Sequence, residues 1–104
     1  MRKNWFWWIL LAIVVQVGSV SASGRAENGK KLFKTCIACH GRDGHGIDAQ
    51  KAPRIAGQFD WYILKALNDF KTKQRVNPTM LPFIAKMSNQ DYQDLAAFVS
   101  TMGQ

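Results

Sequence analysis

The segment that constrains this chain most is Cys36-Ile37-Ala38-Cys39-His40, which holds both of its cysteines and one of its two histidines. The C-x-x-C-H spacing suits covalent attachment of haem, in which two thiols form thioethers with the porphyrin and the adjacent histidine binds the iron. The same side chains could also form a dithiol redox pair, part of a zinc site or a small disulfide. Each interpretation makes a different demand on the rest of the chain.

The other three interpretations find less support in the sequence. A structural zinc site needs four ligands, and because a second C-x-x-C motif is absent, His45 would have to join His40 and both cysteines in one short loop. A thioredoxin-like pair expects a βαβ pattern, which no segment shows. A disulfide between Cys36 and Cys39 would close a loop too small to restrict the unfolded chain much. The motif therefore favours haem attachment.

The beginning of the chain has the order of a secretory signal peptide. Basic residues come first, an unbroken apolar run follows over 5–15, and small and polar residues come next. This order predicts a signal peptide over 1–22 and one domain over 23–104. A retained membrane anchor is the alternative, but a spanning helix needs about 20 apolar residues, and Gln16 and Gly18 interrupt the run.

Removal of that segment would leave 82 residues and lower the formal net charge from +7 to +5. A domain of this size rarely buries enough apolar surface without a disulfide, a metal or another link, and a covalent haem would supply one. Export would place the domain in the periplasm, with the membrane reached only through partners. The basic charge predicts redox partners with acidic docking surfaces, and no segment suggests an element that reads nucleic acid.

Two segments in the first three quarters of the chain have a helical pattern. Residues 26–38 carry an apolar stripe that passes through Gly29, and a glycine inside a helix predicts a close crossing with another helix. Residues 59–73 begin with an acidic side chain and end with basic ones, as the helix dipole prefers. The apolar face of this second helix is predicted to contain Phe59, Ile63, Ala66, Leu67 and Phe70.

A third helix is predicted to begin after Ser88. Ser88 is a natural N-cap with Asp91 three residues further on, which is an acidic variant of the capping box. Met87 and Tyr92 occupy the two positions of a hydrophobic staple, and the apolar stripe continues from Leu95 toward the end of the chain.

The segments between these helices read as ordered loops. Residues 47–58 lack a clear period, and Pro78 and Pro82 disfavour regular helix around Met80. No segment alternates with the period of a strand. The chain is therefore predicted to be all-α, with about three main helices and long loops.

A haem iron bound by His40 leaves a sixth coordination position to be filled. His45 is only five residues away in a glycine-rich loop, so it is not expected to reach the opposite face of the ring. The staple explains Met87, and the apolar stripe of the last helix explains Met102. Met80 lies between two prolines and has no comparable structural role, so it is the predicted sixth ligand.

With these residues identified, positions 26–104 resemble a class I cytochrome c, nearest to the small bacterial monohaem cytochromes of the c4, c5 and c553 kind. The resemblance rests on NGKKLF, CIACHGRDG, APRIAGQ, WYILKALNDFK, RVNPTM and MSNQDYQDLAAFVS, which occur in that order. It implies the cytochrome c fold around one covalent haem c. Thioethers would form at Cys36 and Cys39, and His40 and Met80 would be the axial ligands of the iron.

The resemblance also implies contacts around these ligands. The carbonyl of Pro53 would accept a hydrogen bond from the Nδ1–H of His40, and Arg75 would lie close to a haem propionate. Asn77 or Thr79 would donate to the sulfur of Met80 or to a propionate. Gly29 and Phe33 would cross the last helix near Leu95 and Phe98. Neither His45 nor Arg54 inherits a role.

The expected function is that of a monomeric one-electron carrier in the periplasm, and not an enzyme. One alternative is a haem subunit that relays electrons inside a larger oxidoreductase complex. Another is a haem enzyme or sensor whose sixth ligand is labile. Low-spin iron with a methionine ligand would support the carrier, whereas high-spin iron or CO binding would support the enzyme or sensor.

Overall fold

The structure is a computed structural model that describes residues 24–104, so the predicted signal peptide over 1–22 lies outside it. The α-helices of this part are α1 (Ala26–Leu32), α2 (Ile37–His40), α3 (Asp60–Thr72), α4 (Leu81–Ile84) and α5 (Asn89–Val99). Two short 3₁₀ turns occur at Phe33–Thr35 and Asp48–Gln50. No strand forms within 24–104, where only an isolated bridge joins Ile47 and Ala52. The all-α prediction is therefore confirmed.

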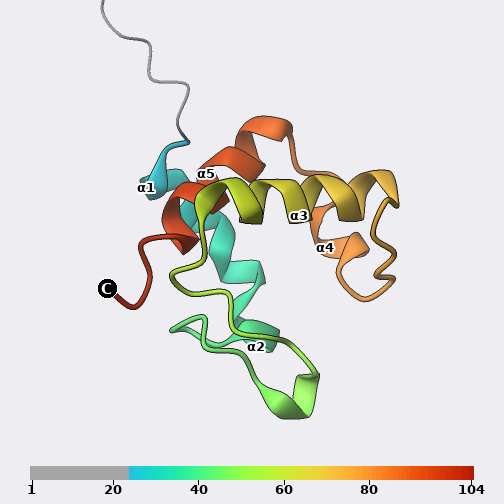
Figure 1. Ribbon diagram of the computed structural model, residues 1–104. Coiled ribbons are helices and arrows are strands. Elements are labelled where there is room, and N and C mark those ends of the chain that lie inside the picture. The colour runs from blue at the N-terminus through green and yellow to red at the C-terminus, as the bar shows by residue number, and fades with distance from the viewer. Residues whose placement is uncertain (1–23) are drawn as a thin grey trace, which may run out of the picture.

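Helices α1, α3 and α5 form one group, and α2 with the loops around it hangs below them (Figure 1). Helix α5 is central to this group because both α1 and α3 pack against it, while α4 packs on α3. Seven buried side chains form the core between these helices. They are Phe33, Leu67, Phe70, Ile84, Tyr92, Leu95 and Val99.

The predicted close crossing at Gly29 is present. A Cβ on Gly29 would lie 2.0 Å from the backbone oxygen of Asp94 and 2.7 Å from the Cβ of Phe98. The rings of Phe33 and Phe98 pack one helical turn further along, with their centroids 5.5 Å apart. The residue opposite Gly29 is Asp94, directly before the predicted Leu95.

The predicted start of α5 is also confirmed. The Ser88 side chain accepts a hydrogen bond from the Asp91 backbone at 3.0 Å, and the Asp91 carboxylate accepts one from the Ser88 backbone at 3.0 Å. Tyr92 is fully buried, and its hydroxyl donates to the carbonyl of Ile84 at 2.7 Å. Through this bond α5 holds the C-terminal end of α4.

Three local predictions need correction. The predicted helix over 26–38 is interrupted by the 3₁₀ turn at Phe33–Thr35 and extends to His40. The region around Pro82 is not only loop, because α4 forms there with the proline in its first turn. A proline is tolerated at that position because the first amide groups of a helix have no partner within the helix.

The third correction concerns Phe59, which was expected on the buried face of α3. Phe59 precedes the first helical residue, and 67% of the residue is exposed. Its ring stacks on Trp61, with centroids 5.9 Å apart, and Trp61 meets Tyr62 edge to face. The predicted apolar face thus began one residue before the helix itself begins.

Among residues 24–104, no helix combines the length and the apolar character that crossing a membrane requires.

Candidate haem site

The two cysteines lie at the start of α2 and within it. Cys36 is the residue before the helix, and the amides of Cys39 and His40 donate to its carbonyl at 3.3 and 2.9 Å. Residues three apart on one helical turn lie on the same face, so this backbone presents both sulfurs to one side. The two thiols are free and half-buried.

The environment of Cys36 favours its protonated form. Burial raises the pKa of the Cys36 thiol, the Cys39 side chain adds to the rise, and a contact with the Thr35 hydroxyl at 3.8 Å opposes it. Reactive redox cysteines instead have a lowered pKa, because the thiolate is the nucleophile. The Cys36 thiol therefore does not have the lowered pKa of a reactive redox cysteine.

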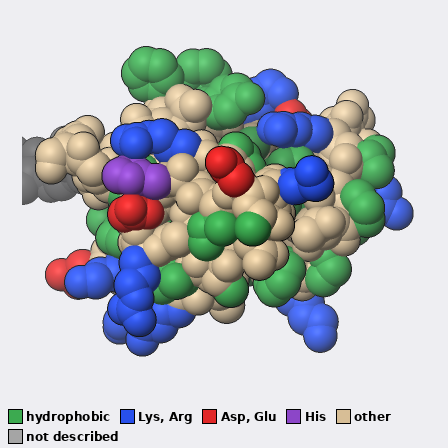
Figure 2. Space-filling view, turned by 90° about the horizontal axis from the view of Figure 1, so that it is seen from below, with side chains coloured by type: hydrophobic (Ala, Val, Ile, Leu, Met, Phe, Trp, Pro, Cys, Tyr) green, Lys and Arg blue, Asp and Glu red, His purple; other side chains and the backbone are tan. Residues whose placement is uncertain are grey.

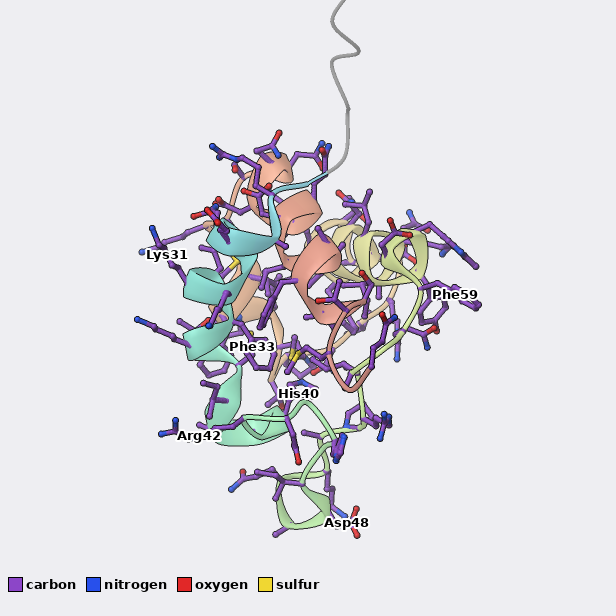
Figure 3. All side chains as sticks on the ribbon, turned by 90° about the vertical axis from the view of Figure 1, so that its left-hand side faces the viewer. Lys31, Phe33, His40, Arg42, Asp48 and Phe59 are labelled. Atoms are coloured by element: carbon purple, nitrogen blue, oxygen red, sulfur yellow. The ribbon has the colours of Figure 1, made fainter. Side chains whose placement is uncertain are left out.

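His40 is buried and fixed in orientation. Only 6% of the residue is exposed, and its Nδ1 lies 2.8 Å from the carbonyl oxygen of Pro53. A carbonyl can only accept, so Nδ1 carries the proton and Nε2 holds the lone pair that can bind a metal. Figure 3 shows His40 below the Phe33 end of the core, on the segment that leads into the lower loops.

Two loop segments hold the Pro53 carbonyl in front of His40, the first over residues 41–46 and the second over residues 47–58. The amide of Gly46 donates to the carbonyl of His40 at 2.9 Å, and the amides of Ile55 and Ala56 donate to the carbonyl of Gly44 at 2.8 and 3.0 Å. The first loop therefore turns back on His40 and binds the second loop directly after Arg54.

The glycines of the first loop make this arrangement possible. Gly46 has a φ of +87°, and a Cβ there would lie 2.7 Å from the carbonyl carbon of Pro53. Any other side chain would push the Pro53 peptide away. Sequence reasoning treated the three glycines of GRDGHG only as loop formers, so it missed this contact with the residue that orients His40.

Met80 is the residue directly before α4 and is half-buried against the core. The side-chain oxygen of Asn77 accepts hydrogen bonds from the amides of Thr79 and Met80, both at 3.1 Å. Asn77 therefore fixes the Met80 backbone through its oxygen, and donation by Asn77 or Thr79 to the Met80 sulfur or to a propionate stays a prediction. In the sequence, the position of Met80 between Pro78 and Pro82 indicated that this segment is not regular helix.

Arg75 extends beside α3. Its guanidinium carbon lies 4.8 Å from the ring centroid of Phe70, and its amide donates to the carbonyl of Asp69 at 3.1 Å. Together with Tyr62 and Lys65 it lines a small surface cleft. The residue as a whole is exposed.

The other candidate ligands have different surroundings. Nearly half of the His45 side chain is exposed, and its Nδ1 lies 3.1 Å from a carboxylate oxygen of Asp43. The hydrogen bond from the His45 amide is the main cause of the lowered pKa of Asp43. Met87 packs against the core at the start of α5, and Met102 does so beyond its end.

The donor set suits haem better than a protein-bound metal ion. Within 24–104, no group of three or more histidine, cysteine, aspartate or glutamate side chains could hold a metal. The motif instead provides two thiols on one face and one imidazole nitrogen, which are the groups that covalent haem attachment requires.

Comparisons with known proteins agree with this chemistry. The family model described as "Cytochrome c" matches residues 26–103. Cytochrome c4 of Pseudomonas aeruginosa is 35% identical over 92 residues, which cover 88% of this chain and 45% of that protein. A thiosulfate dehydrogenase electron acceptor of Stutzerimonas stutzeri is 32% identical, over 91% of this chain and 47% of that protein.

The fold is similar to that of solved structures as well. The structure of cytochrome c4 from Acidithiobacillus ferrooxidans superposes with a TM-score of 0.69 at 31% identity, over 79% of this chain and 53% of that one. The chain thus spans about half the length of these relatives.

Proposed function

Since the chain belongs to the cytochrome c family, we propose that it is a periplasmic one-electron carrier whose haem iron is bound by His40 and Met80. Its cofactor is a covalently attached haem c, with Cys36 and Cys39 at the attachment spacing. The relatives named cytochrome c4 are electron-transfer proteins, and this chain is not an enzyme. Bound haem supplies an iron that cycles between the ferric and ferrous states.

One observation carries the proposal. The 2.8 Å hydrogen bond between His40 Nδ1 and the Pro53 carbonyl fixes the tautomer in which Nε2 is the metal-binding nitrogen. Such a bond also makes an imidazole ligand more basic and holds its ring orientation. Burial of His40 keeps water from this bond. These features suit a permanent axial ligand beside two attachment thiols.

Met80 would supply the opposite ligand. Its backbone is anchored by Asn77 and by the start of α4, so the side chain extends from a fixed point. A neutral thioether opposite histidine raises the potential of a c-type haem. It also occupies the sixth position, which suits electron transfer without a bound substrate. Arg75 would pair with a haem propionate, because this exposed residue packs its guanidinium on the Phe70 ring and such a group binds carboxylates well.

The ligand set is tested by optical spectra of the oxidised and reduced haem protein. We expect low-spin iron and, in the oxidised state, the weak long-wavelength band of iron bound to a methionine sulfur. Met80→Ala should remove that band, produce high-spin iron and allow CO to bind at neutral pH. Met87→Ala is the matched control, because this half-buried methionine lies at the start of α5. Loss of the band in Met87→Ala alone would disprove ligation by Met80.

A fixed relay in a larger complex is the second candidate. The specific observation in its favour is the relative named as a thiosulfate dehydrogenase electron acceptor. A relay would purify from its host together with a larger oxidoreductase, whereas a free carrier would purify alone and as a monomer. A sensor with a labile sixth ligand would bind CO without any substitution.

The partners of the carrier would present acidic surfaces. Lys34 lies two residues before the C-x-x-C-H motif and Arg42 lies two residues after it, and both are exposed. Lys31 and Arg42 extend to the same side of the molecule, opposite to Phe59 (Figure 3). Seen from the side of the lower loops, Lys and Arg side chains form one cluster at an edge of the molecule, and others are spread over the rest of this face (Figure 2). Complementary charge at such an edge accelerates encounter more than it strengthens binding.

A further inference from the structure

The last residue of α5 and the residues that follow it touch both loops of the haem site. The amide of Gly57, in the second loop, donates to the carbonyl of Val99 at 3.0 Å. The methyl carbon of Met102 lies 3.2 Å from the point at which a Cβ on Gly44 would stand, and the Cβ of Ala56 lies 3.1 Å from the same point. One methionine side chain therefore packs at the junction where Gly44 of the first loop meets Ala56 of the second.

That junction is part of the support of the Pro53 carbonyl. The carbonyl of Gly44 accepts hydrogen bonds from the amides of Ile55 and Ala56. These bonds fix the backbone that immediately follows Pro53 and Arg54. Gly44 is buried and has a φ of +71°, so the contact with Met102 forms at the backbone itself and not at a mobile side chain. Interiors this closely packed transmit small displacements to their neighbours.

We propose that Met102 is a positioning residue for electron transfer, which keeps the Pro53 carbonyl on the Nδ1–H of His40 and thereby lowers the reduction potential of the haem. Met102 packs against the core with one part of its side chain and against Gly44 with its methyl group. An unbranched thioether fills such an irregular gap well. The inference rests on the proposed ligation of iron by His40.

The expected direction follows from the hydrogen bond. A carbonyl that accepts the Nδ1 proton makes the imidazole a stronger electron donor, which stabilises ferric iron. Truncation of Met102 removes packing at Gly44 and gives the loop more freedom, so the bond from His40 to Pro53 opens more often. A weaker donor stabilises ferric iron less, and the potential rises.

The test compares three variants of the haem-containing protein. In Met102→Ala we expect a higher reduction potential and an exchange of the His40 Nδ1 proton with solvent that is about tenfold faster, measured by NMR in the reduced state. Met102→Leu, which restores most of the volume, should return both values toward those of the unchanged protein. Met87→Ala is the matched control for a merely structural loss, because it removes a half-buried methionine from the other end of α5.

The possible outcomes separate this role from the ligation itself. If Met102→Ala and Met87→Ala change the potential and the proton exchange equally for the same loss of stability, Met102 has no positioning role. Unchanged values in Met102→Ala would have the same meaning. If the unchanged protein shows no haem-shifted Nδ1 proton from His40, the proposed ligation by His40 is wrong instead.

Discussion

Asp94 is a charged side chain with no solvent exposure, located where α5 meets the start of α1. Its carboxylate accepts hydrogen bonds from the Arg25 amide at 2.7 Å, the Asn28 side chain at 2.7 Å and the Gln90 side chain at 2.8 Å. Burial alone would raise the pKa of Asp94, but these donors and the Arg25 guanidinium lower it below the ordinary 3.8. A buried carboxylate satisfied in this way stabilises the ionised form.

We therefore expect Asp94→Ala to lower the free energy of unfolding at pH 7 by about 2 kcal/mol, since it leaves buried donors without a partner. Because the pKa of Asp94 is lower in the folded protein, its stabilisation is complete above the unfolded value of 3.8. The stabilisation is lost as the pH falls through the folded value. The difference between the two proteins should thus shrink in acid.

Urea unfolding of the haem protein at pH 7 and at pH 3 measures this difference. Asp48→Ala is the control, because Asp48 is exposed in the 3₁₀ turn of the lower loops. It should change stability by less than about 0.5 kcal/mol. A difference for Asp94→Ala that does not depend on pH would contradict the assigned role of the carboxylate.

At the level of secondary-structure elements, the fold depends on how closely α1 approaches α5. The point of contact is Gly29, where the backbone of Asp94 takes the space that a side chain would need. Helix propensity alone would favour alanine at this position by about 1 kcal/mol. The packing opposes that gain, because a backbone carbonyl on α5 cannot rotate away as a side chain could.

Gly29→Ala should therefore destabilise the protein by about 3 kcal/mol, as overpacking of a tight contact does. Thermal unfolding followed by circular dichroism measures the change. Lys30→Ala, an exposed neighbour on the same helix, should leave the unfolding temperature within a few degrees of its original value. A stabilised Gly29→Ala protein would mean that α1 does not lie as close to α5 as described.

Sequence patterns predicted those features of these elements that depend on neighbouring residues. The capping box of Ser88 and Asp91 is local, and a glycine on an apolar stripe has few explanations other than a close crossing. The same patterns missed α4, because a proline can either end a helix or begin one. They placed Phe59 inside because periodicity does not mark where a helix starts.

In the haem site, too, the features that depend on neighbouring residues could be predicted and those that depend on distant residues could not. The motif and its chemistry were legible in the sequence, because the attachment residues are adjacent along the chain. The contacts of Asp94 with α1 and of Met102 with Gly44 join residues more than 50 positions apart. Contacts of this kind follow from the packing of whole helices, so no local sequence pattern predicts them.

The whole molecule carries a formal excess of positive charge. Exposed lysines and arginines occur in several elements, but Lys31, Lys34 and Arg42 surround the attachment motif in sequence. Charge near the site of electron exchange should steer anionic reactants toward it. The C-terminal end of α3, where Lys73 follows the helix, lies on the other side of the molecule from α1 (Figure 1).

We expect the oxidation of the reduced protein by hexacyanoferrate(III), an anionic reagent, to slow as salt is added. Lys31→Glu should reduce the rate at low salt by about twofold more than Lys73→Glu, although both change the net charge equally. Stopped-flow absorbance of the haem measures these rates. Equal effects of the two variants would indicate that only the total charge matters and that no docking edge exists near α1.

The aromatic stack at the start of α3 gives the protein an internal optical reporter. Trp61 is the one tryptophan in residues 24–104, and 61% of the residue is exposed. Its emission in the native state should therefore already have the long-wavelength maximum of an indole in water. A haem quenches a nearby indole by energy transfer, and expansion of the chain relieves that quenching. Unfolding of this domain would accordingly be visible in the brightness of its fluorescence and hardly in its colour.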